Sequence, residues 1–195
     1  MDLPKKDKYG VNILSYSQIS LFKKDKESFY KRYIKREKFK GNEYTDFGIR
    51  VGHALEHNDF SNFDYIEQET LKKITRLDEF ERPVFLRYND FYVVGYIDTN
   101  NFDLSEIIDY KTGGKLKELQ YMRDDYNQLQ IYALGIKQET GFAPKKASVE
   151  FLRRRGNIYK GQRLMVDDED PIKIDVDLST ERLQNVYSDI FKTAN

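Results

Sequence analysis

Apolar residues recur at intervals of three and four positions in four separate stretches of the chain. In the last stretch, for example, Leu183, Val186 and Ile190 fall on one face of a helix. Gly141 and Pro144 end the third stretch. The pattern predicts helices over about 17–34, with a break near 24–25, and over 46–57, 124–139 and 180 onward.

Alternation of apolar and polar residues replaces this spacing in the middle of the chain. Asn89-Asp90 lies between two alternating runs, as is typical of a β-hairpin turn. Residues 60–80 carry no clear pattern. The alternation predicts strands over about 84–88, 91–98, 104–111, 146–152, 158–165 and 172–176. This order of elements predicts an α/β fold (α+β mixed), in which helices flank a mixed central sheet.

The length and charge of the chain limit what it can be. Its 195 residues are the size of one domain, so we expect a single domain over 1–195. Lys and Arg number 33, and Asp and Glu number 33, so the formal net charge is zero. Proteins that coat nucleic acid through bulk charge are strongly basic. Any binding of a polyanion must therefore depend on local clusters of cations.

The composition excludes several other classes. There is no cysteine, and hence no disulfide, thiolate-bound cluster or thiol nucleophile. The N-terminus has no apolar segment typical of a secretory signal, and the apolar runs are far shorter than the ~20 residues of a membrane helix. The 28 Tyr and Phe residues (15 plus 13) supply material for a core. We therefore expect a globular cytoplasmic protein that does not associate with membranes.

Three charged residues fall on two consecutive predicted strands. Asp98 ends one strand, and Asp109 and Lys111 lie two positions apart on the next, so these two point to the same face. If the strands are neighbours, two carboxylates and one ammonium converge. Two hard oxygen ligands suit Mg²⁺ with a phosphate substrate, and a lysine can orient or deprotonate the attacking water or neutralise charge on phosphorus. The alternative is an ordinary surface ion pair.

The same residues resemble the core of the PD-(D/E)xK nuclease superfamily, and more narrowly its RecB-type exonuclease branch. Each matching motif is short, but four occur in the family's order over about residues 15–136. The resemblance implies a restriction-endonuclease-like fold. The motifs are S-Y-S-Q-I at 15–19, Phe47-Gly48 with Leu55-Glu56, Asp98 with I-I-D-Y-K-T-G at 107–113, and Gln128 with Tyr132.

The resemblance also implies roles for the acidic residues and the lysine. Asp98 and Asp109 would bind Mg²⁺ or Mn²⁺ together with the backbone carbonyl of Tyr110. Glu56 would complete the metal shell directly or through water. Lys111 would act on the nucleophilic water. For Glu56, a solvated acid on a helix remains an alternative.

Gln128 and Tyr132 lie four positions apart, and therefore on one face of a helix. By the resemblance, they would order the site and meet the DNA strand. The alternative for Tyr132 is an aromatic residue of the core.

Two features depart from the RecB-type pattern. The branch usually has a metal-binding histidine four residues after the glycine of its first motif, and here that position is Gly52. His53 is adjacent, but one helical step is a rotation of about 100°. His53 is thus either a ligand on a distorted helix or an ordinary polar residue. Some relatives hold an iron–sulfur cluster on four cysteines, which this chain cannot.

Clusters of cations are candidate contacts to DNA phosphates. Residues 31–40 hold six basic side chains against one Glu, although a solvated face explains them equally well. Three adjacent arginines repel one another unless an anion meets them. The individual residues that we predict to bind DNA, besides Tyr132, are Lys115, Arg153, Arg154 and Arg155.

Acids are concentrated near the C-terminus, where residues 167–177 hold six against one Lys. We expect an exposed loop and an edge strand there, with a second metal site as the alternative.

The motifs together predict a metal-dependent DNA nuclease, and the resemblance favours an exonuclease. Stand-alone members of the branch are similar to bacteriophage recombination exonucleases, which process DNA ends for a single-strand annealing protein. A different class remains open, namely a DNA-binding component of a phage or replication complex that kept the fold without the activity. RNA also remains open as a substrate, since nothing in the motifs reads a 2′-hydroxyl.

Overall fold

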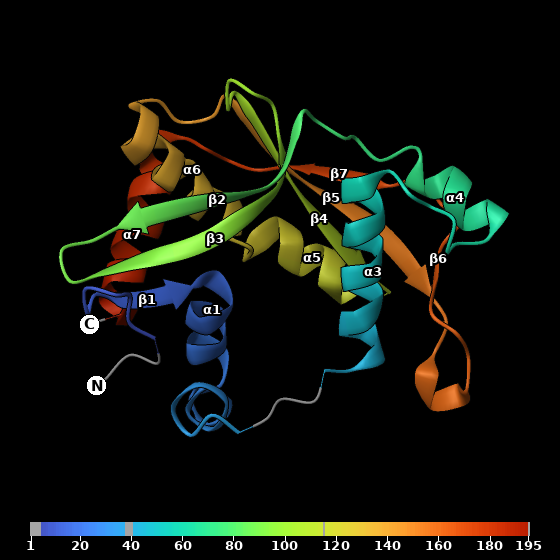
Figure 1. Ribbon diagram of the computed structural model, residues 1–195, viewed down its shortest axis with the longest axis horizontal. Coiled ribbons are helices and arrows are strands. Elements are labelled where there is room, and N and C mark those ends of the chain that lie inside the picture. The colour runs from blue at the N-terminus through green and yellow to red at the C-terminus, as the bar shows by residue number, and fades with distance from the viewer. Residues whose placement is uncertain (1–4, 38–40, 115, 195) are drawn as a thin grey trace.

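The computed structural model describes residues 5–37, 41–114 and 116–194. After a first short strand, a run of helices precedes three consecutive strands, and helices and strands then follow in smaller groups (Figure 1). The helices are α1 (Tyr16–Lys24), α2 (Lys26–Phe29), the π-helix η1 (Tyr30–Ile34), α3 (Glu43–His57), α4 (Tyr65–Leu71), α5 (Leu116–Asp124), α6 (Gln128–Thr140), the 3₁₀ turn η2 (Ile158–Lys160) and α7 (Thr180–Ala194). The strands are β1 (Asn12–Ser15), β2 (Glu79–Arg87), β3 (Phe91–Asn100), β4 (Glu106–Gly113), β5 (Lys146–Arg155), β6 (Met165–Val166) and β7 (Ile172–Asp175).

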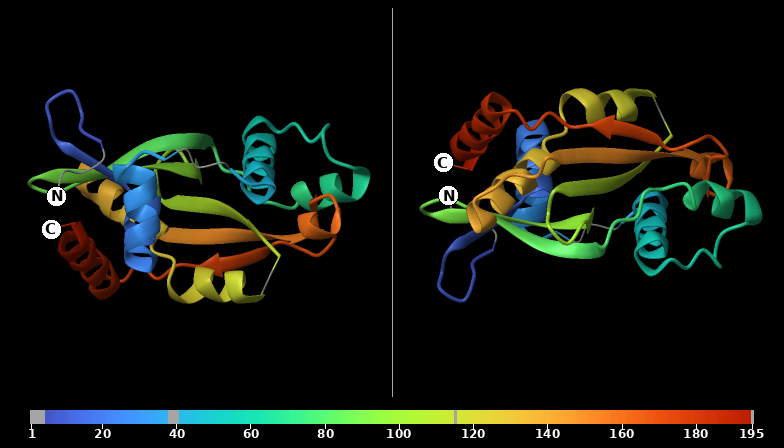
Figure 2. Two further views of the ribbon diagram at one scale, coloured as in Figure 1. Left: turned by 90° about the horizontal axis from the view of Figure 1, so that it is seen from below. Right: turned by 90° about the horizontal axis from the view of Figure 1, so that it is seen from above.

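The described strands form one mixed sheet. Its main path runs β1-β3-β4-β5-β6, with β2 paired to β3 and β7 paired to β5. The β1–β3 and β4–β5 pairs are parallel, and the remaining pairs are antiparallel. Figure 2 shows α3 and α4 on one side of this sheet and α5 and α7 on the other. The predicted fold, a mixed sheet flanked by helices, is confirmed.

Each face of the sheet carries its own hydrophobic core. Strand β5 divides the two, because Phe151 packs with residues of α6 and α7 while its neighbour Leu152 packs with residues of α3. The α6 side includes Leu129 and Ile136, which are almost wholly buried. The α3 side includes Val51 and Leu55. These two layers fix α3 and α6 on opposite faces of the strands that carry Asp98 and Asp109.

Local sequence explains where several helices begin and end. The Ser15 side chain accepts a hydrogen bond from the Gln18 amide, and the Gln18 side-chain oxygen accepts one from the Ser15 amide, which starts α1. Asp64 and Glu67 form the same reciprocal pair at the start of α4. Gly141, with φ of +87°, ends α6 in the left-handed conformation that glycine adopts without strain.

The sequence predicted most of these elements, and the break near residues 24–25 is confirmed, since α1 and α2 meet there. The predicted strand over 158–165 is wrong, because this segment forms η2 and a turn before the short β6. Helix α6 begins at Gln128, not near residue 124. Helix α5, strand β1 and helix α4 were not predicted.

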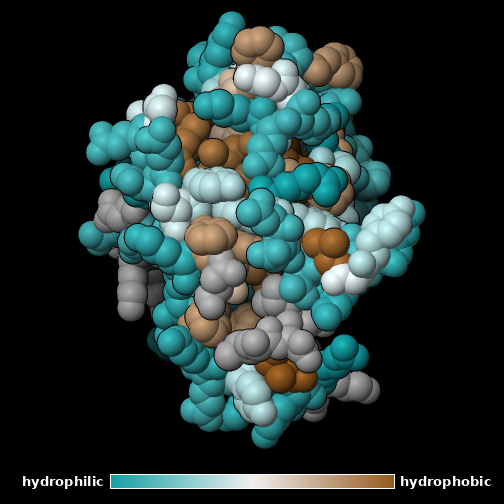
Figure 3. All heavy atoms as spheres, turned by 90° about the vertical axis from the view of Figure 1, so that its left-hand side faces the viewer, coloured by the Kyte–Doolittle hydropathy of each residue, from teal (hydrophilic) through white to brown (hydrophobic). Residues whose placement is uncertain are grey.

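The molecular surface is largely polar. Figure 3 shows one end of the molecule, where hydrophilic side chains predominate and hydrophobic ones form small separate spots. Within the described ranges, no helix combines the length and the apolar character needed to cross a membrane.

Candidate active site

The candidate site lies where β3 and β4 separate. The two strands pair at Thr99–Ile108 and at Asn100–Ile107. Asp98 and Asp109 are the next residues of each strand. Here the Asp98 Oδ2 atom accepts a hydrogen bond from the Tyr110 amide at 2.6 Å. The two acids are therefore neighbours on adjacent strands, as the sequence predicted.

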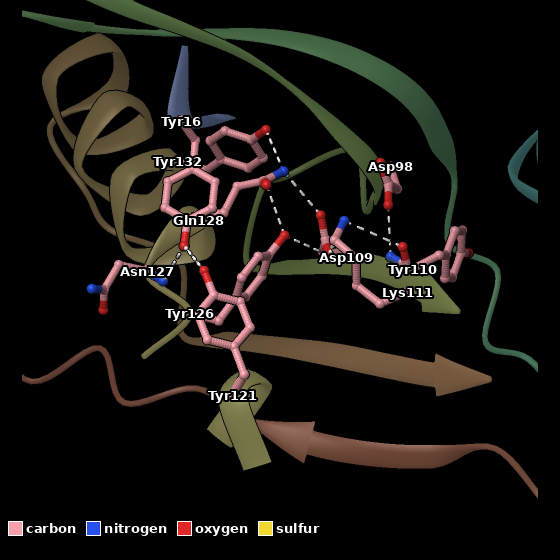
Figure 4. A network of polar contacts seen from close by, with 10 residues as sticks. All are labelled: Tyr16, Asp98, Asp109, Tyr110, Lys111, Tyr121, Tyr126, Asn127, Gln128 and Tyr132. Atoms are coloured by element: carbon pink, nitrogen blue, oxygen red, sulfur yellow. Dashed lines mark hydrogen bonds and ion pairs between the residues drawn. The ribbon is translucent and has the colours of Figure 1, made fainter. Parts of the chain in front are cut away.

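Asp109 is completely buried, and both of its carboxylate oxygens have partners (Figure 4). Its Oδ2 atom lies 2.7 Å from the Lys111 ammonium and 2.9 Å from the Tyr126 hydroxyl. Its Oδ1 atom accepts a hydrogen bond from Gln128 Nε2 at 3.0 Å. The predicted residues Asp109, Lys111 and Gln128 thus form one connected group.

Tyr126 belongs to this group, although the motifs gave no sign of it. Its hydroxyl lies 2.7 Å from Gln128 Oε1 as well as near Asp109, and the Lys111 ammonium is 5.4 Å from the centre of its ring. Burial and the Asp109 charge raise its pKa well above the ordinary value, so the hydroxyl keeps its proton. Tyr126 therefore contacts three predicted site residues. The signal that the sequence offered for Tyr126 as a site residue was its position two residues before Gln128.

Tyr132 lies in the hydrophobic core. Only 4% of it is exposed, and its ring lies so close to Gly95 that a Cβ there would be 2.2 Å from Cε1. Its hydroxyl accepts a hydrogen bond from Gln128 Nε2 at 2.6 Å. This burial favours a role in the core, and contact of Tyr132 with DNA stays an untested prediction. Tyr132 packs as in the alternative interpretation, and it also holds the Gln128 amide.

A cavity of about 470 Å³ opens beside these acids, between α3 and the sheet. Asp98 and Lys111 line it from the strands. Gly48, Gly52 and Glu56, each four positions apart, line it from α3. The predicted residue Glu56 thus faces the same cavity as Asp98 and Lys111.

Glu81 also lines this cavity and was missed in the sequence. It lies opposite Asp98, because the neighbouring pairs are Phe80–Thr99 and Arg82–Ile97. Its backbone has φ of +52°, which is uncommon for a residue with a side chain. Only the pairing register of β2 and β3 could have revealed it.

The charges of these groups affect one another. Burial raises the pKa of the Asp98 carboxyl to about 7, and repulsion by Asp109 adds to the rise while Lys111 opposes it. Burial works against the Lys111 ammonium, but attraction to Asp109 and Asp98 outweighs it and raises the Lys111 pKa. Burial and then the Glu56 charge raise the pKa of Glu81. The charged form of Lys111 is therefore favoured beside these two carboxylates.

The arrangement of oxygens is compatible with a divalent cation. The Lys111 ammonium lies 3.3 Å from the Tyr110 carbonyl oxygen and 2.7 Å from Asp109 Oδ2, so these two oxygens already converge on one positive charge. Within the described ranges, no three His, Cys, Asp or Glu residues lie close enough to hold a metal ion by themselves. Mg²⁺ needs only one or two carboxylates, since it keeps water and shares substrate phosphate.

His53 lines the cavity as well, but its ring stacks on His57 with centroids 4.1 Å apart. The carbonyl oxygen of His53 lies 3.0 Å from His57 Nδ1. Nothing lies within 4 Å of a Cβ built at Gly52, where the RecB-type pattern has its histidine. Helix α3 is continuous through this region, so the sequence departure is also a structural one.

The arginines at the end of β5 meet acids of the same chain. Arg153 forms an ion pair with Glu169. Arg154 stacks on the Tyr44 ring at 4.3 Å and approaches Glu118 at 3.9 Å, and the Arg155 charge acts on Asp168. The argument that only a polyanion could relieve their repulsion is therefore wrong. Their contact with DNA remains a prediction, and Lys115 lies outside the described residues.

The acidic stretch over 167–177 meets these cations instead of forming a separate site. Besides Glu169, Asp170 pairs with Lys73 at 2.6 Å. Strand β7 lies within this stretch and, in the described part of the chain, pairs only with β5. The predicted loop and edge strand are confirmed.

The fold is similar to that of a solved structure. No protein-family model matches the sequence, and no curated protein matches it. A crystal structure of a "Putative exonuclease" from Eubacterium rectale superposes with a TM-score of 0.57 at 11% identity, over 91% of this chain and 77% of that one. The structure of SSO0001 covers 98% of this chain and 79% of its own, with a TM-score of 0.46 at 15% identity. The chain thus shares its fold with a protein described as an exonuclease.

Proposed function

We propose that the chain is a Mg²⁺- or Mn²⁺-dependent nuclease of the PD-(D/E)xK superfamily, RecB-type branch, which hydrolyses phosphodiester bonds in DNA. The observation that carries the proposal is the connected group of Asp98, Asp109 and Lys111 beside a cavity lined by Glu56. An isolated surface ion pair would not bury Asp109 completely or give both its oxygens partners.

Residues of the group have separate tasks in this proposal. Asp98, Asp109 and the Tyr110 carbonyl would hold the metal ion, and Glu56 would complete its shell through water. The ion, when bound, supplies a Lewis acid for the phosphate and lowers the pKa of its water. Lys111 orients the water or neutralises charge on the phosphate. Gln128 fixes the Asp109 carboxylate by its hydrogen bond to Oδ1.

The finer parts of the proposal depend on resemblance. They are exonuclease action, a role in DNA recombination or phage DNA metabolism, and a single-strand annealing protein as partner. The fold shared with a protein described as an exonuclease supports the first of these.

The proposal is tested by incubating the protein with linear double-stranded, linear single-stranded and closed circular DNA, and with RNA, in Mg²⁺, Mn²⁺ or EDTA. We expect cleavage of linear DNA with either metal and none in EDTA. Asp109→Asn, purified in parallel, should lack the activity. Cleavage of the closed circle would rule out a requirement for a free end, and metal-independent cleavage would contradict the proposed site.

One observation favours a second candidate, a DNA-binding component without nuclease activity. Gly52 places no side chain where the family's metal-binding histidine would be. If the wild type binds DNA and cleaves none of these substrates, this candidate replaces the first. The variant Gly52→His then provides a direct check, because restored metal binding and cleavage would show that the missing ligand is the cause.

A further inference from the structure

Strands β2 and β3 have one covered and one uncovered face. Val84 and Leu86 of β2 and Val93 of β3 are buried toward α6. Their neighbours alternate outward, where Tyr96 is 54% exposed and Phe85 is 40% exposed. In Figure 1 the two strands lie in front of α6, so the outward face is the one turned to the viewer.

The outward face is unusually aromatic for an exposed sheet. We call Phe85, Arg87, Tyr92 and Tyr96 the aromatic track. Arg87 lies opposite Tyr92, and Phe85 lies opposite Val94, diagonally between the two tyrosines. The Phe85 and Tyr92 rings are 5.9 Å apart, and the Arg87 guanidinium lies 5.9 and 5.6 Å from their centres. The track thus combines flat rings with a cation held against them.

The aromatic track leads into the candidate active site. Continuing along the same face, β2 reaches Glu81 and β3 reaches Asp98, two residues after Tyr96. Both acids line the cavity beside Lys111. A polymer bound along the track would therefore place its next unit beside these two acids.

We propose that the aromatic track holds an unpaired segment of the DNA strand that is cut, an inference that rests on the proposed nuclease function. Every base has a flat face that stacks on aromatic rings, and the arginine attracts phosphate. Alternate residues of a strand advance by about 6.6 Å, roughly twice the ~3.4 Å between stacked nucleotides of one DNA strand. Rings spaced by about 6.6 Å can stack on bases that are separated from one another, but they do not fit the continuous base stack of a duplex.

Binding of labelled oligonucleotides tests the inference without relying on cleavage. Asp109→Asn serves as the background in EDTA, so that the DNA stays intact. We expect Phe85→Ala and Tyr96→Ala each to raise the Kd for single-stranded DNA by about fivefold to a hundredfold, and to leave the Kd for duplex DNA almost unchanged. Tyr96→Phe, which keeps the ring, should bind as tightly as the background.

Phe142→Ala is the matched control, because Phe142 is 80% exposed and lies just after α6, outside the four residues of the track. It should not change either Kd. Unchanged single-strand binding in the track variants, or an equal loss for duplex DNA, would overturn the inference. A track variant that binds DNA normally but changes its self-association in sedimentation would also overturn the inference, because the track would then be an interface between protein molecules. Absence of cleavage by the wild type would count against the proposed function alone.

Discussion

Tyr126 is the residue through which the polar contacts of the candidate site are joined. It approaches Asp109, Gln128 and Lys111 with a buried hydroxyl and ring. Outside the site, the Tyr16 ring packs edge-on against it at 5.3 Å. Its position is therefore fixed from both sides, which suits a residue that holds a carboxylate in one orientation.

Removing the Tyr126 hydroxyl should weaken the proposed reaction. A hydrogen bond to a charged group contributes about 1.5–3 kcal/mol, so we expect Tyr126→Phe to lower kcat for DNA by roughly tenfold or more. Tyr121→Phe is the matched control, since that hydroxyl lies 3.0 Å from the Tyr16 hydroxyl and outside the group around Asp109. Equal kcat values for the two variants, measured at saturating Mg²⁺, would show that the Tyr126 contact is irrelevant to the reaction.

Asp98 gives the protein a pH dependence. Its folded pKa of about 7 lies above the ordinary aspartate value of 3.8, so the folded state binds more protons between these values. Stability should therefore fall as pH rises from about 4 to 7, by up to about 4 kcal/mol for a shift of three units. Asp98→Asn should remove this fall. Denaturant unfolding in EDTA at pH 5 and 8 measures it, and an unchanged pH slope would contradict the assignment.

At the residue scale, the sequence predicted the groups that carry charge and missed those that depend on tertiary register. Asp98, Asp109 and Lys111 could be found because alternation along two strands fixes their faces, and Gln128 was found through the resemblance of its motif. Glu81 could not, since only pairing with β3 brings it opposite Asp98. The burial of Tyr132 likewise depends on Gly95 of another element.

At the scale of elements, α6 approaches β3 closely enough that one position must be glycine. A Cβ on Gly95 would lie 2.2 Å from the Tyr132 ring, so Gly95→Ala should destabilise the fold by about 1–3 kcal/mol. Gly52→Ala is the control within α3, where nothing lies within 4 Å. It should stabilise the helix by up to about 1 kcal/mol. In urea unfolding, we expect the two substitutions to change the unfolding free energy with opposite signs. A Gly95→Ala variant as stable as the wild type would contradict the close packing.

Glu67 connects α4 to the segment before β7. It is completely buried, accepts a hydrogen bond from the Val166 amide at 2.9 Å and pairs with Arg163. Glu67→Ala leaves a buried amide unpaired, so we expect a loss of about 2–3 kcal/mol in unfolding free energy.

Glu69→Ala, on the same helix, is the comparison for Glu67→Ala. It removes only the exposed ion pair with Lys72 and should change the free energy by less than about 0.5 kcal/mol. Similar values for the two variants, in the same unfolding assay, would show that the Glu67 contacts do not support the fold.

Long periodic elements were predicted well because their own residues determine them. Helix α3 and strands β3 and β5 were found, with ends that differ by a few residues. The predicted strand over 158–165 failed because its apolar residues pack under α3 in irregular conformation: Leu164 is buried and Ile158 lies against the same core. Helix α5 is only nine residues long, which is too short for its apolar positions to establish a helical period in the sequence.

At the scale of the whole molecule, the zero net charge is the sum of opposed local clusters. Acids surround the cavity beside Lys111, and acids of 167–170 pair with cations such as Arg153 and Lys73. The acids of 167–170 thus pair with cations that the overall composition would leave free to contact DNA. In the proposed function, few cations would remain for the DNA phosphates, so flat aromatic surfaces would supply a larger share of the affinity.

The rate of nucleotide release from linear DNA in Mg²⁺ tests the central claim, compared between the wild type, Lys111→Met and Lys173→Met. Lys173 pairs with Glu106 on the surface and serves as the control. We predict wild-type rates for Lys173→Met and a loss of roughly 10²- to 10⁴-fold for Lys111→Met, the range typical of a group that acts in the transition state. Full activity of folded Lys111→Met would contradict the proposed active site.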